Sequence, residues 1–571
     1  MIVRVLPDVS GFDKEFDYSV PPELEPKMCI GAMVRVELAG RRVNAWVTAV
    51  DPEDADTGRS LLPLLKWRGL GPTQEVLSSA EVIASRYMGR RRSLLSTASP
   101  DPLVHTLPAT RRHESPPGGG PFADLARNGG GLIRCGLNQD VAVVVRSVAR
   151  LGPMLCVVPN FSLVRTLAAS LRGSGFSVAV FPDEWAQAVA GADIVIGTRA
   201  AVWAPVSDIA TVIIWDEHDE SLNEERVPTW NAREVGILRA SKLGAACFLA
   251  SPIPTPQALH WAADRIYRTA EADLDAWGSV RVVDISPTEE VRVPAMFSSE
   301  FLACARDNTL TVLGIVNSTG VARLLSCRQC NEIAKCEACG SVVIQSKDDL
   351  LHCGACGLER PLVCSFCGAG AFKNLRRGVS RVRSELERAC GRPVHEITGS
   401  SQGESPQSGP FVAVGTEAIL HRVQSADVIA FLDFDSEMDS GFYRANEIAL
   451  GLVARALRVA SQDGFVIVQT KSPNRNFLDL LAVGSVDALI EREYLQRRDL
   501  ALPPYSVLVK ISGTASDEWF SNIKTLPLGC DVNQRTGLVR APDFESMRGF
   551  LDSVEIPRSG KVRFEVQPLR A

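Results

Sequence analysis

Eight of the fifteen cysteines lie in one short block, and this block constrains the chain more than any other feature. They form four C-x-x-C pairs: Cys327/Cys330, Cys336/Cys339, Cys353/Cys356 and Cys364/Cys367. A C-x-x-C turn aims two thiolates at one metal ion, so eight thiolates suffice for two closed sites of four sulfurs each. A closed site leaves no coordination position for water. The spacing therefore predicts two zinc ions per chain, both structural and neither catalytic.

The segment between the second and third pairs indicates which pairs share a metal. Residues 340–345 and 350–352 are typical of strands, and the polar residues 346–349 between them are typical of a turn. A hairpin brings its two ends together, which predicts one zinc on Cys336, Cys339, Cys353 and Cys356, and the other on Cys327, Cys330, Cys364 and Cys367. Disulfides or a redox dithiol are the alternatives. An N-terminus without a signal-peptide pattern disfavours the first, and four regular pairs disfavour the second.

Length and composition limit the class of protein. The chain has 571 residues, of which 46% are hydrophobic and 22% charged, as expected for a globular chain of about three to five domains. The sequence has no run of 18 or more uninterrupted apolar residues, so we expect no membrane partner and a cytoplasmic location. The net charge is −6, so any contact with nucleic acid must come from local basic patches.

The N-terminal third divides into three parts. Residues 1–50 are typical of β structure, with a hairpin turn at residues 39–42. Residues 73–104 have helical spacing of their apolar positions. Residues 107–121 are rich in proline, glycine and arginine and are typical of a linker.

The rest of the chain alternates apolar runs with helical patterns, which is typical of parallel sheets flanked by helices. We predict buried strands at residues 141–145, 154–158, 178–181, 194–196 and 211–214, and further strands at 411–414, 428–432 and 464–469. These runs form two α/β stretches. The cysteine block interrupts the second one, which resumes with the strand at residues 411–414. Residues 398–410 are typical of a flexible loop, and about 85 C-terminal residues form a small mixed domain.

An acidic pair follows one of the predicted strands. Asp216 and Glu217 come directly after residues 212–215; in a nucleotide-driven motor such an aspartate holds magnesium and the glutamate orients water. The run Trp215–Asp219, with His218, resembles the D-E-x-H box of superfamily 2 helicases, and within them the PriA family of primosomal replication-restart proteins. Segments 16–18, 158–163, 197–205, 231–235 and 502–505 resemble F-D-Y, V-P-E-I-S-L, G-T-R-S-A-V-F-A-P, H-A-R-D-V and Y-P-P-F of that family, in the same order.

The resemblance implies a multidomain α/β architecture. It comprises a 3′-DNA-end-binding β domain at 1–70, a winged-helix-like segment at 71–106, the linker at 107–121, RecA-like helicase lobes at 122–318 and 371–480, an inserted double zinc module at 319–370, and a small α+β C-terminal domain at 481–571.

The segments that serve ATP in this family are altered. Residues 132–140 replace the phosphate loop G-V-T-G-S-G-K-T; they contain no G-K-[ST], and no lysine lies between Lys66 and Lys242. Segments 250–255, 415–422 and 454–458 also depart from the family motifs. ATP and magnesium are therefore not expected as cofactors. Asp216, Glu217 and His218 are expected to be vestigial, capping a helix or pairing with arginines, and Arg455 and Arg458 to be interface residues between the lobes rather than arginine fingers.

Candidate DNA contacts lie in the N-terminal region. By resemblance, Phe16, Asp17 and Tyr18 line a pocket for a DNA 3′ end, where an aromatic ring can stack and a carboxylate can accept a hydrogen bond from a hydroxyl. The alternative is an ordinary hydrophobic strand with an aspartate at its edge. Five arginines could pair with phosphates, and the alternative for them is a solvated face. They are Arg41, Arg42, Arg90, Arg91 and Arg92.

Three functional hypotheses follow. The first is a replication-restart protein that binds stalled forks and branched or single-stranded DNA and seeds reloading of the replication machinery without helicase activity. Its protein partners would be primosome and helicase-loading proteins and the single-stranded DNA-binding protein. The second is an active ATP-dependent 3′–5′ helicase with a non-standard nucleotide site. The third is a zinc-ribbon interaction module that no longer binds DNA.

Overall fold

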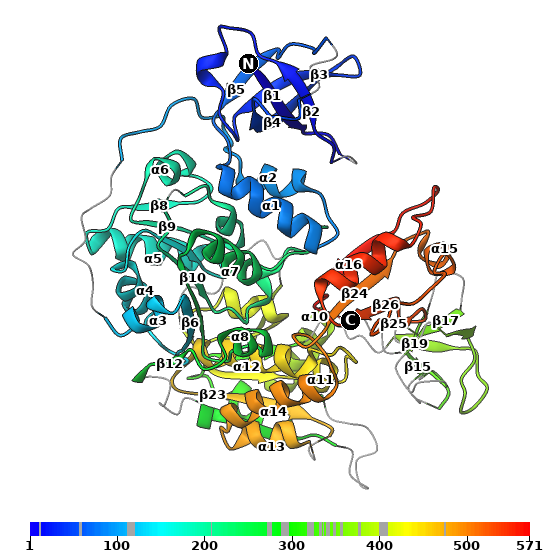
Figure 1. Ribbon diagram of the computed structural model, residues 1–571. Helices are drawn as coiled ribbons and strands as arrows, with labels where there is room; N and C mark the ends of the chain where they lie inside the picture. Colours follow the sequence, from blue (N-terminus) through cyan, green and yellow to red (C-terminus); the bar gives the residue numbers. More distant parts are fainter. Residues whose placement is uncertain are drawn as a thin grey trace.

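The computed structural model describes residues 1–570 except 11–12, 56–59, 111–119, 207, 271–276, 287–295, 317–324, 331–333, 335, 338–342, 346–349, 354–357, 375–378, 399–408 and 473–474. Within this part of the chain, helices and strands form an N-terminal β domain, two α/β lobes, a small cysteine-rich module and a C-terminal α+β domain (Figure 1). The N-terminal β domain lies over helices α1 and α2, which in turn lie over the first lobe. In the described residues no helix has the length and apolar character that a membrane crossing requires.

The N-terminal domain is an antiparallel sheet with strand order β2-β1-β4-β3-β5. Its strands are β1 (Ile2–Pro7), β2 (Phe16–Ser19), β3 (Met33–Leu38), β4 (Arg41–Val50) and β5 (Lys66–Gly69). The predicted hairpin turn between β3 and β4 is confirmed: Ala39 and Gly40 both have positive φ, 49° and 74°, as a two-residue turn of this hand requires.

Residues 71–106 contain two helices, α1 (Gln74–Arg86) and α2 (Arg91–Ala98), and no strand. The expected winged-helix-like segment therefore has helices but no β wing. The apolar side of α1, including Val76 and Ile83, packs into the core that it shares with the first lobe. Because both helices are used to join the β domain to that lobe, this segment is a connection between domains.

Lobe 1 is a seven-stranded parallel sheet with order β12-β6-β11-β10-β7-β9-β8. Its strands are β6 (Gly130–Arg134), β7 (Met154–Val157), β8 (Val178–Val180), β9 (Ile194–Gly197), β10 (Thr211–Trp215), β11 (Ala246–Ser251) and β12 (Ile266–Arg268). Its helices are α3 (Ala123–Arg127), α4 (Val141–Ala149), α5 (Phe161–Gly173), α6 (Trp185–Ala190), α7 (Ala232–Leu243) and α8 (Pro256–Ala262).

One predicted strand of this lobe is wrong. Residues 141–145 begin helix α4, where the Asp140 side chain accepts a hydrogen bond from the Ala142 N–H and caps the first turn. Val144, Val145 and Val148 are buried, whereas Val143 is 46% exposed, so the run has one apolar face of a helix. A short apolar run does not distinguish a buried strand from a buried helix, and the cap decides here.

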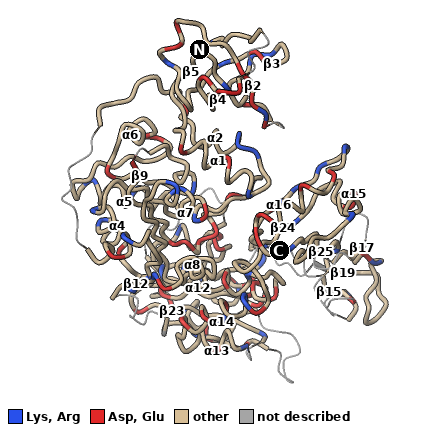
Figure 2. Tube along the Cα trace, viewed as in Figure 1, with Lys and Arg blue, Asp and Glu red and all other residues tan. Residues whose placement is uncertain are grey.

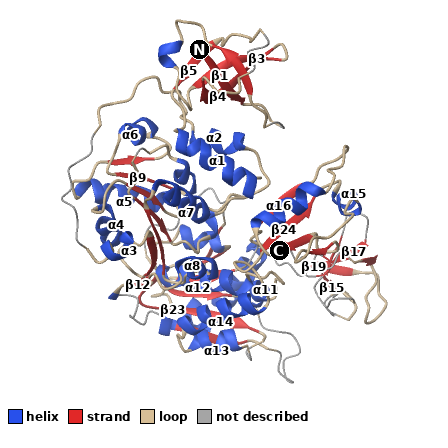
Figure 3. Cartoon of the chain, in the orientation of Figure 1, coloured by secondary structure: helices blue, strands red, loops and turns tan. Residues whose placement is uncertain are grey.

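Lobe 2 is a six-stranded parallel sheet with order β13-β23-β22-β14-β21-β20. Its strands are β13 (Val280–Asp284), β14 (Val312–Ile315), β20 (Val394–Ile397), β21 (Val412–Gly415), β22 (Ala426–Phe431) and β23 (Ala460–Thr470). Its helices are α9 (Ser299–Arg306), α10 (Val379–Cys390), α11 (Asp435–Met438), α12 (Ala445–Val459), α13 (Asn476–Ala482) and α14 (Val486–Asp499). Figure 3 shows helices on both sides of these strands.

Two expected domain boundaries change. Lobe 1 does not extend to residue 318, because β13 and β14 pair with lobe 2 strands, and β14 lies between β21 and β22. The C-terminal domain does not begin at residue 481, because Val486 and Leu489 of α14 pack into the lobe 2 core. The cysteine-rich module is therefore an insertion within lobe 2.

The inserted module and the C-terminal domain are both small. The module has strands β15 (Leu325–Cys327), β16 (Val343–Gln345), β17 (Leu350–Cys353), β18 (Glu359–Pro361) and β19 (Phe372–Asn374). The C-terminal domain has β24 (Val507–Ser512), α15 (Ser516–Ser521), β25 (Asp531–Asn533), β26 (Leu538–Ala541), α16 (Phe544–Ser553) and β27 (Arg563–Val566). Its antiparallel sheet, with order β25-β26-β24-β27, contacts lobe 1 through Arg563, whose guanidinium donates to the Glu225 carbonyl at 2.9 Å.

Candidate metal centre and interlobe cleft

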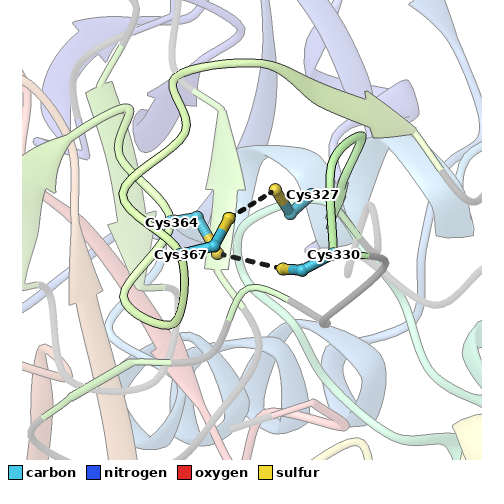
Figure 4. A group of neighbouring side chains, drawn as sticks. All are labelled: Cys327, Cys330, Cys364 and Cys367. Atoms are coloured by element: carbon cyan, nitrogen blue, oxygen red, sulfur yellow. Dashed lines mark hydrogen bonds between the residues drawn. The ribbon is translucent and has the colours of Figure 1, made fainter.

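Four sulfur atoms of the cysteine block form one cluster. The Sγ atoms of Cys327, Cys330, Cys364 and Cys367 all lie within 4.8 Å of one another (Figure 4). The Cys327–Cys367 sulfur distance is 3.5 Å and the Cys330–Cys364 distance is 3.6 Å. A tetrahedral zinc site with bonds of about 2.3 Å places its sulfurs about 3.8 Å apart. The cluster therefore has the donor set and spacing that a structural zinc ion needs.

Strand pairing explains why pairs far apart in sequence meet. Strands β15 and β19 are antiparallel, with Cys327 opposite Phe372, so the turn after β15 faces the turn before β19. The first and fourth C-x-x-C pairs lie in these two turns. The structure thus brings together the outer two pairs, as the hairpin argument predicts.

Backbone groups of the cluster favour thiolates. The Cys330 N–H lowers the pKa of Cys327 to about 6, with help from the Gln329 N–H. The Cys367 and Phe366 N–H groups lower the pKa of Cys364 in the same way. The Ala369 N–H also lowers the pKa of Cys367, but burial and hydrogen bonds with Cys327 and Cys364 raise it overall. Metal ligation needs the four sulfurs deprotonated, and four thiolates repel one another. A bound cation would offset that repulsion.

The inner two pairs are described in part. The predicted hairpin is confirmed, since β16 and β17 are antiparallel with Val343 opposite Cys353. Cys336 and Cys353 are buried in the module core, with 4% and 0% exposure. Cys339 and Cys356 lie outside the described residues. The second zinc site therefore stays a prediction.

Asp216 of the D-E-x-H segment is held by lobe 2. It follows β10, has φ of 51° and is 4% exposed. The Arg458 guanidinium of α12 donates to both of its carboxylate oxygens, at 2.6 and 2.8 Å. A planar two-bond contact of this kind is among the strongest ion pairs that proteins make. The carboxylate that would hold magnesium in a motor is therefore already engaged by a guanidinium.

Glu217 and His218 are held within lobe 1. The Glu217 carboxylate accepts hydrogen bonds from the Thr255 N–H at 2.7 Å and from Arg233 at 2.8 Å. His218 Nδ1 lies 2.8 Å from the Ser251 hydroxyl oxygen, and burial lowers the pKa of this imidazole. Asp216 and Glu217 are thus ion-paired with arginines, which is one of the two structural roles expected of them.

In the segment that replaces the phosphate loop, residues 132–140, Asp140 and Leu137 both make structural contacts. Asp140 caps α4, so a carboxylate of the chain occupies the helix N-terminus where a phosphate would accept backbone N–H groups. Leu137 is 4% exposed and belongs to the apolar cluster of lobe 2, as does Ile253 of lobe 1. No local sequence signal marks these two residues as interlobe contacts, and they were not predicted.

The three residues expected in a DNA 3′-end pocket have different environments. Tyr18 is 3% exposed, and its hydroxyl donates to the Glu37 carbonyl at 2.7 Å, so its ring belongs to the domain core and cannot stack on a base. Phe16 packs partly against the same core. The Asp17 carboxylate accepts two hydrogen bonds from Arg4, at 2.7 and 3.1 Å. No motif marks Arg4 as a partner of Asp17, and it was not predicted.

The candidate phosphate-binding arginines also divide. Arg41, Arg42 and Arg90 are exposed. Arg91 pairs with Glu15 at 2.6 Å and Asp13 at 3.1 Å, and Arg92 pairs with Asp8 at 2.6 Å. Along the whole trace basic and acidic residues are intermixed (Figure 2). Arg91 and Arg92 thus join α2 to the β domain and are less available to DNA than the other three.

The arrangement of the two lobes is characteristic of one class of protein. Two parallel α/β lobes, with a D-E-x-H segment at the carboxyl edge of the first, are the architecture of helicase-type proteins. Solved structures give only a weak likeness of this kind. Dbp5 of S. cerevisiae bound to RNA and ADP BeF3 has a TM-score of 0.36 and 10% identity, covering 75% of this chain and 98% of that chain.

Comparison of sequences gives a more specific likeness than comparison of structures. Residues 4–100 match the family model described as the PriA 3′DNA-binding domain. The probable replication restart protein PriA of Mycobacterium tuberculosis is 27% identical over 574 residues, which cover 89% of this chain and 86% of that protein. Replication restart protein PriA of Thermotoga maritima is 26% identical, covering 66% of this chain and 55% of that protein. Residues 4–100 thus match the PriA 3′DNA-binding domain, and the chain resembles PriA proteins over most of its length, which confirms the resemblance drawn from the motifs.

Proposed function

We propose that this chain is a replication-restart protein that binds forked and branched DNA and does not unwind it. The observation that carries the proposal is the match of residues 4–100 to the PriA 3′DNA-binding domain, in a chain whose Asp216 is already bound by Arg458 of the other lobe. Binding by the N-terminal domain requires no motor. The lobes and the module would then act as a platform for primosome and helicase-loading proteins and for single-stranded DNA-binding protein.

Zinc would have a structural role in this protein, whereas ATP would not be hydrolysed. Zinc on the cluster of four cysteines would supply only structure, because all four positions are protein sulfurs. The cleft has no counterpart of the phosphate-loop lysine, and its acidic pair is already bonded to Arg458 and Arg233. Phosphoryl transfer needs the phosphates held and their charge neutralised, and these residues offer neither.

Forked DNA is expected to leave ATP hydrolysis at background in this protein. The variant Glu217→Gln is the matched control, because it removes the residue that would orient water in a working motor. Both proteins should give the same rate in a coupled ATPase assay with and without a fork. DNA-stimulated hydrolysis in the parent that disappears in Glu217→Gln would instead support an active helicase, the second hypothesis.

Fork affinity is expected to fall steeply as salt rises, because each neutralised phosphate releases counterions. Replacing Arg41, Arg42 and Arg90 with alanine should reduce the slope of log K against log salt by about 0.9 for each phosphate that is no longer neutralised. Replacing Arg172, an arginine of lobe 1 paired with Glu184, should leave the slope unchanged. Fluorescence anisotropy with a labelled fork measures both. An equal slope in the triple variant would identify these arginines as a solvated face.

Asp17 is proposed to read the 3′ hydroxyl of the DNA end, held in position by Arg4. The same anisotropy assay tests this with a fork whose leading-strand 3′ hydroxyl is blocked, which should bind more weakly. Indifference to the block would remove Asp17 from the pocket. A protein that fails to bind any fork would leave the third hypothesis, a zinc-containing interaction module.

A further inference from the structure

One face of helix α12 lies directly on the D-E-x-H segment of the other lobe. Gly451, Arg455 and Arg458 are spaced at i, i+4 and i+7, which places them on the same side of a helix. A Cβ added at Gly451 would lie 3.9 Å from the His218 ring and 4.0 Å from the Ile253 side chain. Arg455 donates to Asp219 at 2.9 Å. The close approach at Gly451 lets both arginines reach lobe 1.

Arg458 joins the two halves of the former nucleotide site. Its Nη atoms bind the Asp216 carboxylate, and its Nε donates to the Leu137 carbonyl at 2.9 Å. Asp216 follows strand β10, and Leu137 lies in the loop that replaces the phosphate loop. One guanidinium therefore uses all three of its nitrogen atoms to hold both segments to lobe 2.

Two further contacts cross the same boundary. Arg134 at the end of β6 and Arg268 at the end of β12 share Asp487 of α14, at 2.8 and 3.1 Å. Leu137 and Ile253 add apolar contact, because both belong to the cluster that contains Leu450 and Leu457 of α12. The boundary between the lobes thus contains the ion pairs of Arg455 and Arg458, the apolar contact of Leu137 with α12, and the separate ionic contact at Asp487.

We propose that Arg458, Arg455 and the Leu137 filling form an internal lock, which keeps the two lobes in one closed arrangement with no nucleotide. Side chains of the chain itself bridge the two lobes at this boundary. The inference goes beyond the proposed function and does not depend on DNA binding.

The lock has a geometric consequence for the rest of the molecule. The N-terminal domain is fixed to lobe 1, where Arg239 binds Glu75 of α1 at 2.6 Å and the Trp185 indole donates to the Ala98 carbonyl at 2.8 Å. The cysteine-rich module is inserted in lobe 2. Locked lobes therefore hold the N-terminal domain at one position relative to lobe 2.

Hydrogen exchange of the full-length protein, read by mass spectrometry, tests the lock. Arg458→Gln should exchange at least about tenfold faster than the parent in residues 135–149 and 445–459, because it leaves Asp216 buried without its partner. Arg381→Gln is the matched control, since it removes an exposed ion pair with Glu385 on the outer helix α10. The parent should show the same exchange with and without magnesium ATP.

A double-mutant cycle separates the lock from a general reduction in stability. Asp216→Asn combined with Arg458→Gln should exchange no faster than Arg458→Gln alone, because both changes remove one shared contact. If Arg458→Gln does not fold, Arg458→Lys keeps the charge but cannot make the two-bond contact, and it should give a smaller increase in the same segments. Exchange equal to the parent in Arg458→Gln, or fully additive effects in the cycle, would overturn the proposal.

Discussion

Cys364→Ser is expected to release one equivalent of zinc and to unfold the cysteine-rich module, while both lobes keep their fold. Metal binding in small structural zinc sites is worth about 10–16 kcal/mol, which is most of the folding free energy of such modules. This module has only a small apolar core, with Leu325, Val343 and Leu351 among its buried residues. Without metal, its short strands cannot offset their conformational entropy.

Metal analysis and hydrogen exchange of the module measure this result together. The matched control is Cys29→Ser, because Cys29 is exposed and lies in the N-terminal domain, away from the cluster. It should retain all of its zinc. If Cys364→Ser also retained the parent's zinc content, the assignment of Cys327, Cys330, Cys364 and Cys367 to one metal would be wrong.

The second large effect is expected at Arg239, which connects the N-terminal helices to lobe 1. Its side chain is completely buried, and its guanidinium binds Glu75 of α1 and donates to the Ala204 carbonyl at 3.0 Å. Arg239→Ala should lower the free energy of unfolding of this part of the molecule by about 3–5 kcal/mol, because it removes the ion-pair partner of Glu75 and the shared donor of the Val202 and Ala204 carbonyls.

Urea denaturation followed by tryptophan fluorescence reports on this region, since Trp203 and Trp230 make an edge-to-face contact near Arg239's carbonyl partners, with ring centroids 5.6 Å apart. Arg172→Ala is the control, because its ion pair with Glu184 is largely exposed and should be worth at most about 1 kcal/mol. A midpoint for Arg239→Ala as high as that of Arg172→Ala would mean that Glu75 finds another partner or is hydrated.

Short sequence patterns predicted those structural elements that are determined by residues adjacent in the chain. The hairpin turn at Ala39 and Gly40, strand β10 before Asp216, and the β16–β17 hairpin all follow from runs of a few residues. The predicted strand at residues 141–145 failed because five apolar residues in a row suit either a strand or a buried helix. The Asp140 cap was the signal that could have decided it.

Short sequence patterns did not predict which distant strands pair or how the two lobes contact each other. Nothing near Val312 in the sequence indicates that β14 pairs with β21 and β22, so the first lobe was predicted to run too far. The interface role of Arg455 and Arg458 could be predicted, because four segments of the sequence depart from the family motifs that serve ATP. Their partners, and the apolar filling by Leu137 and Ile253, depend on how two lobes meet and have no signal in either segment.

The insertion inside lobe 2 affects the order in which this chain can fold during synthesis. Strand β14 is complete at Ile315, but its neighbour β21 begins at Val412, about a hundred residues later. At a synthesis rate of about 5–20 residues per second, an apolar strand waits about 5–20 s for its partner. During that interval the complete cysteine-rich module emerges, so metal uptake there can precede closure of the sheet that carries it. The edge of β14 thus stays unpaired, and open to aggregation, throughout the synthesis of the module.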